Sequence, residues 1–127
     1  MISDVSTLKI KGTMEIAHHL PNYDGKCSKL HGHRLEYTLS FRGEIGEDGM
    51  IEDFKDLDRI IGIVRDRYDH SNLNDLYELP TLENFATHFL DQVNTEYMYA
   101  KQQRKRGKFV ELEMWETSKY GVVVTYE

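Results

Sequence analysis

The sequence predicts an α+β domain in which an antiparallel four-stranded sheet carries two helices on one face, in the order ββααββ. At both ends of the chain lie segments in which apolar and polar residues alternate, the period of half-buried strands. Between them lie two segments whose apolar residues recur at helical spacing. Strand pairs on either side of two adjacent helices are typical of helices gathered on one face of an antiparallel sheet. With 127 residues, 39% of them hydrophobic and 30% charged, the chain is expected to form a single domain over residues 1–127.

The first two strands are predicted over residues 8–18 and 31–41. The loop between them contains Pro21 and an Asp24-Gly25 pair, which favour a turn. Alternation assigns the following residues to the buried face of the sheet: Leu8, Ile10, Met14, Ile16, His18, His31, His33, Leu35, Tyr37, Leu39 and Phe41. Three of these inward-facing residues are histidines.

Each predicted helix has an N-cap residue and an apolar stripe. Asp53 caps a helix over residues 53–70, and Thr81 caps a second helix that extends towards Tyr99. Residues 71–80 between them are expected to form a loop that ends at a proline. The residues expected on the buried stripes are Phe54, Leu57, Ile61, Val64 and Tyr68 in the first helix and Leu82, Phe85, Ala86, Phe89 and Val93 in the second.

The last two strands are predicted over residues 109–117 and 120–127, joined by a tight turn. Alternation places Val110, Leu112, Met114 and Glu116 on the buried face of the third strand. It places Phe109, Glu111, Glu113 and Trp115 on the outer face. A carboxylate on a buried face needs a cation or a ligand that donates hydrogen bonds to it. The edge of a purine or pterin ring would suit Glu116, because a carboxylate accepts two parallel N–H bonds. The alternative is a frayed strand end, where alternation fails.

The charge and hydropathy of the chain exclude some classes of partner. A net charge of −6 argues against general binding to nucleic acids or anionic membranes, which requires a basic face. No apolar run is long enough to span a bilayer, no signal peptide is recognised, and a single cysteine cannot form an intrachain disulfide, so we expect a cytoplasmic protein. The basic segment KQQRKRGK (101–108) is expected to be a solvated turn, with a contact to RNA or phosphate as the alternative.

Three histidines on the predicted buried face indicate a metal site. His31 and His33 are two residues apart, which places both imidazoles on one face of a strand, and His18 has the matching parity in the neighbouring strand. An inward-facing histidine must be neutral and hydrogen-bonded, or it must bind a metal. Three imidazoles with an open fourth position are the usual ligands of a catalytic zinc ion, so we expect Zn²⁺. His19 is the competing candidate for the first ligand.

Cys27 precedes two of these histidines in a polar loop. Lys26 lies beside it and Lys29 lies close by, and nearby positive charge favours the thiolate form of a cysteine. The residue is therefore a candidate fourth zinc ligand or a candidate base. The alternative is a small buried hydrophobic side chain, the commonest role of a free cysteine.

The other two histidines lie on or near the helices. Asp69 and His70 place a carboxylate beside an imidazole at the end of the first helix, although adjacent residues do not automatically face each other. The alternative for His70 is an interaction with the helix dipole at a C-terminus. His88 lies on the polar side of the second helix and is expected to face solvent.

Five motifs together resemble the 6-pyruvoyltetrahydropterin synthase family, in particular its 6-carboxytetrahydropterin synthase branch. They are MEIAHHLPNYDGKCSKLHGH (14–33), GMIEDFKDL (49–57), YDHSNLN (68–74), PTLEN (80–84) and WET (115–117), in the family's order and approximate spacing. The resemblance implies the tunnelling fold (T-fold), in which ββααββ subunits form barrel-like trimers that stack in pairs into homohexamers, with active sites between subunits. Such an assembly would also cover the two edges that a four-stranded sheet exposes.

The resemblance also implies roles for individual residues. Lys26 and Lys29 are candidates for binding the triphosphate group of the family's substrate, because of their charge and position. The residues that match the family are, for zinc, His18, His31 and His33; for catalysis, Cys27, Asp69 and His70; for anchoring the pterin ring, Glu116; and for lining the pterin pocket, Thr81 and Glu83.

The implied activity is that of a zinc-dependent lyase. It would convert 7,8-dihydroneopterin triphosphate to 6-carboxy-5,6,7,8-tetrahydropterin with release of triphosphate and acetaldehyde, in the queuosine and 7-deazaguanine pathway. The three-residue gap between Cys27 and His31 favours this carboxy-forming branch. The alternatives are the pyruvoyl-forming reaction, which eliminates triphosphate but keeps the three-carbon side chain, and a non-catalytic pterin- or purine-binding module with a structural zinc ion.

Overall fold

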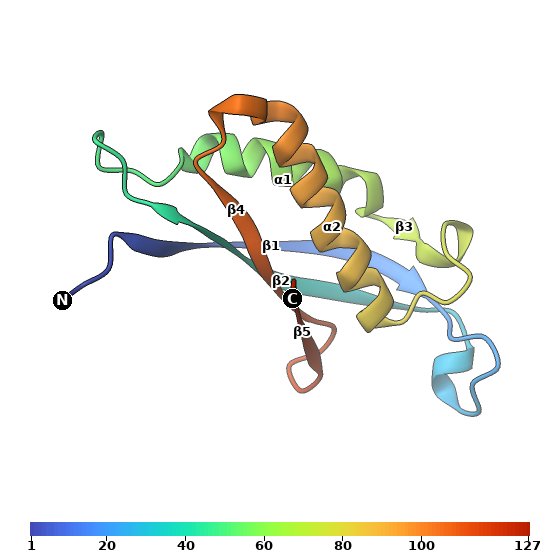
Figure 1. Ribbon diagram of the computed structural model, residues 1–127. Coiled ribbons are helices and arrows are strands. Elements are labelled where there is room, and N and C mark those ends of the chain that lie inside the picture. The colour runs from blue at the N-terminus through green and yellow to red at the C-terminus, as the bar shows by residue number, and fades with distance from the viewer.

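A five-stranded sheet with both helices on one face makes up the protein, as seen in a computed structural model that describes residues 1–127 (Figure 1). The strands lie in the order β3-β1-β2-β4-β5. The predicted α+β class is confirmed, as is the placement of both helices on one face. Neither helix combines the length and the apolar character that crossing a bilayer requires. The elements are β1 Val5–His18, η1 Lys26–Ser28, β2 His31–Glu44, α1 Phe54–Tyr68, β3 Ser71–Asn72, η2 Leu73–Asp75, α2 Leu82–Lys101, η3 Gln102–Arg104, β4 Gly107–Trp115 and β5 Gly121–Thr125, where η denotes a 3-10 helix.

The sheet differs from the prediction in having a fifth strand and in being mixed rather than wholly antiparallel. The extra strand, β3, pairs in parallel with β1, with Ser71 opposite Ile16. The chain reaches this edge because His70 adopts a left-handed conformation with φ 63° and its N–H donates to the carbonyl of Glu15 at 2.6 Å. A two-residue strand is too short to show alternation, so the sequence indicated only a loop over residues 71–80.

The antiparallel pairing of β1 with β2 brings the predicted metal ligands together. The ladder runs without interruption along both strands and ends with His18 opposite His31. The same register places His33 opposite Ile16. The end of β1 and the start of β2 therefore meet at one corner of the sheet, beside the beginning of α2 (Figure 1).

Both helices begin at the predicted caps. The Asp53 carboxylate accepts a hydrogen bond from the Lys55 N–H at 2.8 Å. The Thr81 hydroxyl accepts one from the Asn84 N–H at 3.1 Å. Each cap satisfies an N–H group that has no partner within the helix, which stabilises the start of the helix.

The predicted burial of one residue on the apolar stripe of the first helix is wrong. Phe54 is 55% exposed, because it lies in the first turn of α1, whose buried positions begin at Leu57. Ile60, which the stripe did not include, is fully buried. The remaining predicted positions of this helix are buried: Leu57, Ile61, Val64 and Tyr68.

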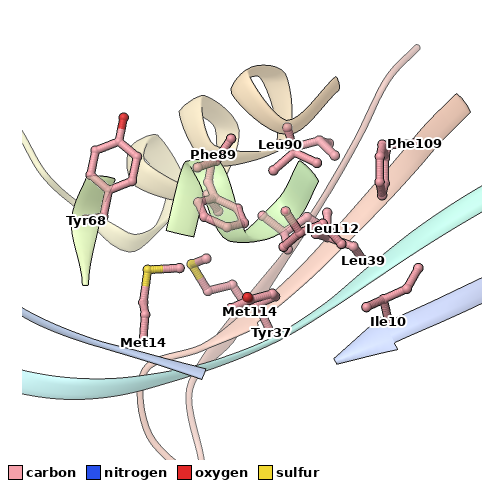
Figure 2. Packing of buried hydrophobic residues seen from close by; sticks show 14 of the residues in the cluster. Ile10, Met14, Tyr37, Leu39, Tyr68, Phe89, Leu90, Phe109, Leu112 and Met114 are labelled. Carbon is pink, nitrogen blue, oxygen red and sulfur yellow. The ribbon is translucent and has the colours of Figure 1, made fainter. Parts of the chain in front are cut away.

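A β-bulge changes the faces of β4. Ser40 of β2 lies opposite Glu111, but Phe41 lies opposite Phe109, so Val110 is an extra residue. The bulge reverses the alternation and turns Phe109 into the core, where its ring lies 5.1 Å from that of Phe41. Figure 2 shows it among the apolar side chains between sheet and helices. The predicted outward direction of Phe109 is therefore wrong, because strict alternation assumes an uninterrupted ladder.

A buried ion pair links the segment just before α1 to the last residue of α2. Glu52 is only 4% exposed, and its carboxylate accepts a hydrogen bond from the Tyr97 hydroxyl at 2.8 Å. The Lys101 ammonium lies 3.2 Å from Glu52 and donates to Asp56 at 2.7 Å. Burial raises the pKa of Tyr97 to about 12, which keeps its hydroxyl protonated as a donor. These contacts join the start of α1 to the end of α2.

The basic segment 101–108 is partly neutralised by acidic neighbours. Besides Lys101, Arg106 is paired: its guanidinium donates two hydrogen bonds to Asp48, at 2.7 and 2.9 Å, and holds the pKa of that carboxyl at about 2. The other basic residues of the segment are exposed, in agreement with a solvated turn: Arg104, Lys105 and Lys108.

We predict that Lys101→Met lowers the free energy of unfolding by about 3 kcal/mol, because the Glu52 carboxylate would remain buried without its cation. Urea denaturation followed by circular dichroism would measure the loss. The double variant Lys101→Met/Glu52→Gln should recover most of it. Lys105→Met is the control at an exposed position of the same segment, with an expected change below about 0.5 kcal/mol. Equal stability of Lys101→Met and Lys105→Met would contradict the prediction.

Candidate metal centre and active site

Three histidine side chains converge at the corner of the sheet where β1 ends and β2 begins. One ligand atom each of His18, His31 and His33 lies within 4.8 Å of the other two. The ring centroids are 4.6, 4.8 and 5.1 Å apart, and the rings meet edge to face. Strand alternation places His31 and His33 on one face, and the register adds His18 from β1. Side chains of this type at this spacing can hold a single metal ion.

Backbone carbonyl groups hold two of the rings in the tautomer that metal binding requires. The Nδ1 of His18 lies 2.7 Å from the carbonyl oxygen of Pro80, and the Nδ1 of His31 lies 2.7 Å from that of Lys29. Because a carbonyl oxygen only accepts, each Nδ1 must carry the proton, which leaves the Nε2 of the neutral ring unprotonated. Hydrogen bonds of this kind orient metal-binding histidines in many proteins. Both Nε2 atoms are therefore free to bind a metal ion.

The third ring is kept neutral mainly by its surroundings. Burial lowers the pKa of His33, the neighbouring His18 and His31 lower it further, and the carboxylate of Glu116 opposes them. The Nε2 of His33 lies 3.7 Å from Oε2 of Glu116. A neutral ring is the form that binds a metal, because the metal and the proton compete for the same lone pair.

His18, rather than the competing His19, belongs to the converging set. His19 follows the last residue of β1, and its backbone N–H donates to the side-chain oxygen of Asn74 at 2.8 Å. The structure therefore places His18, and not His19, in the histidine cluster.

Glu116 and Thr81 border the histidine cluster. Together with His18 they line one narrow crevice between the sheet and the start of α2. The Glu116 N–H donates to the carbonyl of Tyr120 at 3.0 Å, which fixes the turn that follows β4. Glu83, in the first turn of α2, is exposed and does not line this crevice.

Cys27 is a partly buried free thiol in η1. Its carbonyl accepts a hydrogen bond from the Leu20 N–H at 2.7 Å, which closes the loop that follows β1. The thiol is not among the atoms that converge with the three histidines. The neighbouring Lys26 and Lys29 are both exposed.

Asp69 and His70 form a pair at the edge of the sheet. Oδ2 of Asp69 lies 3.1 Å from Nδ1 of His70, and Oδ1 accepts a hydrogen bond from the Glu15 N–H at 2.8 Å. The backbone bond from Glu15, with smaller effects of His70 and Arg65, holds the pKa of Asp69 below its usual value, so this carboxyl stays ionised. The side chain of His70 is 76% exposed and is not part of the histidine cluster.

Several groups that shape the site had no role in the sequence prediction. They include the carbonyls of Pro80 and Lys29, which orient two of the rings. Every residue has a carbonyl group, so no sequence pattern reveals which one a histidine meets. Asn74 also had no predicted role, although it lies within the motif YDHSNLN. Membership in that motif was the one available signal.

The fold and the histidine cluster define an α+β protein with a site suited to a metal ion. Comparison with known proteins gives the family. Residues 7–127 match the sequence profile described as 6-pyruvoyl tetrahydropterin synthase, so the chain belongs to this family. The family predicted from the five motifs is thereby confirmed.

Curated relatives have more than one activity in their names. A putative 6-carboxy-5,6,7,8-tetrahydropterin synthase from Archaeoglobus fulgidus is 36% identical over 93 residues, or 73% of this chain and 76% of the relative. A dihydroneopterin monophosphate aldolase from Pyrococcus furiosus is 31% identical over 94 residues, or 74% of this chain and 76% of the relative.

Solved structures confirm the predicted T-fold. The 6-pyruvoyl tetrahydropterin synthase of Caenorhabditis elegans superposes with a TM-score of 0.83, covering 97% of this chain and 96% of that one at 23% identity. The synthase of Plasmodium falciparum superposes with a TM-score of 0.76, covering 96% of this chain and 98% of that one at 17% identity. At these identities the likeness supports the fold and leaves the reaction open.

We predict that His18→Ala, His31→Ala and His33→Ala each weaken the binding of a divalent metal ion by more than about 100-fold, because losing a ligand costs more than losing its hydrogen-bond partner. Competition with a chromophoric chelator would give the affinities, and elemental analysis the metal content. His88→Ala is the matched control, since His88 is exposed on α2 as predicted. Equal metal content in His33→Ala and His88→Ala would refute the assignment.

Proposed function

We propose that the protein is a zinc-dependent 6-carboxy-5,6,7,8-tetrahydropterin synthase. It converts 7,8-dihydroneopterin triphosphate and water to 6-carboxy-5,6,7,8-tetrahydropterin with release of triphosphate and acetaldehyde, and it serves the queuosine and 7-deazaguanine pathway. The observation that carries the proposal is the cluster of three histidines beside Glu116, in a chain of this family. The name of the Archaeoglobus fulgidus relative supports the carboxy-forming branch.

The histidine cluster suits zinc as the resident ion. Three imidazole ligands with an open fourth position are the donor set of catalytic zinc sites. The carbonyl partners of His18 and His31 supply the outer hydrogen bonds that such ligands usually have. When bound, zinc supplies the Lewis acidity that makes protons of the substrate side chain easier to remove.

Glu116 would anchor the pterin ring. Its carboxylate lies beside His33, and it lines the crevice that Thr81 also borders. A carboxylate accepts two parallel N–H bonds from the amino and ring N–H groups of a pterin. Anchoring the ring would hold the reacting carbons at a constant position relative to the histidines, and small misplacements cost large factors in rate. Thr81 would complete the wall of the pocket within one chain, and the exposed Glu83 would join it where a neighbouring subunit closes over the start of α2.

Cys27 and His70 would move the protons. As a thiolate, Cys27 would take a proton from the substrate side chain, and His70 would act from the other side. Asp69 accepts the hydrogen bond of Nδ1 of His70, which leaves Nε2 free to exchange a proton. Removing and returning protons at neighbouring atoms allows the carbon–carbon bond to break without a high-energy charge on the side chain.

We further propose a homohexamer of two trimers, with active sites between subunits. The crevice beside the histidines has no room even for a water molecule in one chain, whereas ligand pockets begin at roughly 300 Å³. Neighbouring subunits would enlarge it and would bring the exposed His70 to a histidine cluster. Joining sheet edges would also cover the free edges of β3 and β5.

Two further features fit this assignment. Lys26 and Lys29 are exposed near the site and would bind the triphosphate. A proton-transferring Cys27 must stay reduced, which is the state of thiols in the cytoplasm. We therefore place the reaction there.

Two alternatives would give different products, and a third would give none. The pyruvoyl-forming reaction eliminates triphosphate and keeps the three-carbon side chain. Cleavage of dihydroneopterin monophosphate is a second alternative, because the Pyrococcus furiosus relative with that activity in its name is 31% identical to this chain. A pterin- or purine-binding module with a structural metal ion is the alternative outside catalysis.

Mass analysis of the products would decide between these reactions. We predict that the zinc-loaded protein releases acetaldehyde and 6-carboxy-5,6,7,8-tetrahydropterin from 7,8-dihydroneopterin triphosphate. A product that keeps three side-chain carbons, or turnover of the monophosphate alone, would overturn the proposal in favour of the first or second alternative. Pterin binding without any turnover would favour the binding module.

We predict that Cys27→Ala lowers kcat by at least about 100-fold, the usual contribution of one acid-base group. Zinc content should stay unchanged, because the thiol lies outside the converging set. Steady-state kinetics and elemental analysis on the same preparations would test both points. Ser28→Ala, one residue further in η1, is the control and should retain activity. Loss of zinc from Cys27→Ala would make the cysteine a ligand and contradict its role in proton transfer.

A further inference from the structure

The side-chain amide of Asn74 forms a clamp of two hydrogen bonds on the backbone of His19. Its Oδ1 accepts the His19 N–H at 2.8 Å, and its Nδ2 donates to the His19 carbonyl at 3.0 Å. A neighbouring strand would offer one donor and one acceptor in the same way. The amide therefore continues the pairing of β1 one residue beyond the strand itself.

The amide has to take over this pairing because the backbone of β3 turns away. Pairing between β3 and β1 stops at Asn72, and the chain then enters η2, which buries Leu73. The Asn72 side chain accepts the Asn74 N–H at 3.1 Å and so fixes the position of Asn74. Asparagine is the shortest residue that offers both a donor and an acceptor on one planar group, whereas an ionised aspartate only accepts.

The clamp lies between a metal ligand and the loop that carries the thiol. His18 directly precedes the clamped residue, and Leu20 directly follows it. The Leu20 N–H donates to the carbonyl of Cys27 at 2.7 Å. The other hydrogen bonds of residues 20–28 join members of the loop and η1 to one another or to Lys29. The loop is therefore held at its start where Asn74 holds His19 and at its end where the Lys29 carbonyl meets the His31 ring.

We propose that Asn74 is a positioning residue, which sets the location of Cys27 relative to the three histidines. It acts through the backbone of His19 and Leu20 and touches neither the ring nitrogens of the cluster nor the thiol. The effect of Asn74 on how firmly the loop is held follows from these contacts alone. Its effect on turnover rests on the proposed function, in which Cys27 transfers a proton.

The test compares Asn74→Ala and Asn74→Asp with the wild type and with Gln103→Glu. Asn74→Ala removes both bonds. Asn74→Asp keeps the shape but sets a carboxylate oxygen against the His19 carbonyl, and it serves as the second variant if the alanine does not fold. Gln103→Glu makes the same change from amide to carboxylate at an exposed position of η3, outside the site.

Both variants at Asn74 should release the loop without releasing the metal. Hydrogen exchange of the Leu20 amide should rise at least about ten-fold, as expected when hydrogen bonds worth about 1.4 kcal/mol are lost. Alkylation of Cys27 by iodoacetamide should speed up several-fold. Zinc affinity should stay within about two-fold of the wild type, because Pro80 still holds the His18 ring. In turnover, kcat should fall about 10- to 100-fold with little change in KM, as expected when a catalytic group is misplaced.

Each outcome bears on a separate part of the proposal. Wild-type exchange at Leu20 and wild-type alkylation of Cys27 would overturn it, and so would loss of zinc, which would make Asn74 a support of the ligand His18. A released loop with unchanged kcat would overturn the catalytic part. If the wild type turns over no pterin, the proposed function fails, while exchange and alkylation still test the clamp.

Discussion

The uninterrupted antiparallel pairing of β1 with β2 is the constraint on which the site depends. The ladder ends with His18 opposite His31, and residues two apart share a face, so one register brings three imidazoles together. A slip by one residue would turn a whole strand over and disperse the cluster. Burial of Ile16 and Leu35, which share the face of the histidines, opposes such a slip.

The histidine rings must be correctly turned to bind a metal ion, and groups that bind no metal achieve this. The carbonyl that holds the His18 ring belongs to Pro80, directly before the N-cap of α2, so the packing of this helix on the sheet sets the orientation of a candidate ligand. The carbonyl that holds the His31 ring belongs to Lys29, at the end of the loop that carries Cys27. Helix packing and loop closure therefore both orient side chains of the histidine cluster.

The candidate groups for proton transfer lie outside this rigid corner. Cys27 lies on a loop tied back to β1 through Leu20, and Asn74 holds the point where that loop begins. His70 lies at the sheet edge in a left-handed conformation, with its ring oriented by Asp69 and largely exposed. The arrangement separates candidate metal ligands on strands, which the core immobilises, from candidate acid-base groups at the periphery. In the proposed hexamer, contacts between subunits would bring the two sets together.

The sequence by itself determined the order of the elements, both N-caps and the three metal-ligand candidates, because alternation, helical spacing and capping are local patterns. It could not predict the bulge at Val110, the two-residue strand β3 or the carbonyl that meets His18, because each arises where residues distant in sequence come into contact. Only the tertiary structure decided that Phe109 is buried and that His18, rather than His19, is in the cluster. Local patterns show which face a side chain occupies, whereas the register and the packing of distant segments select its neighbours.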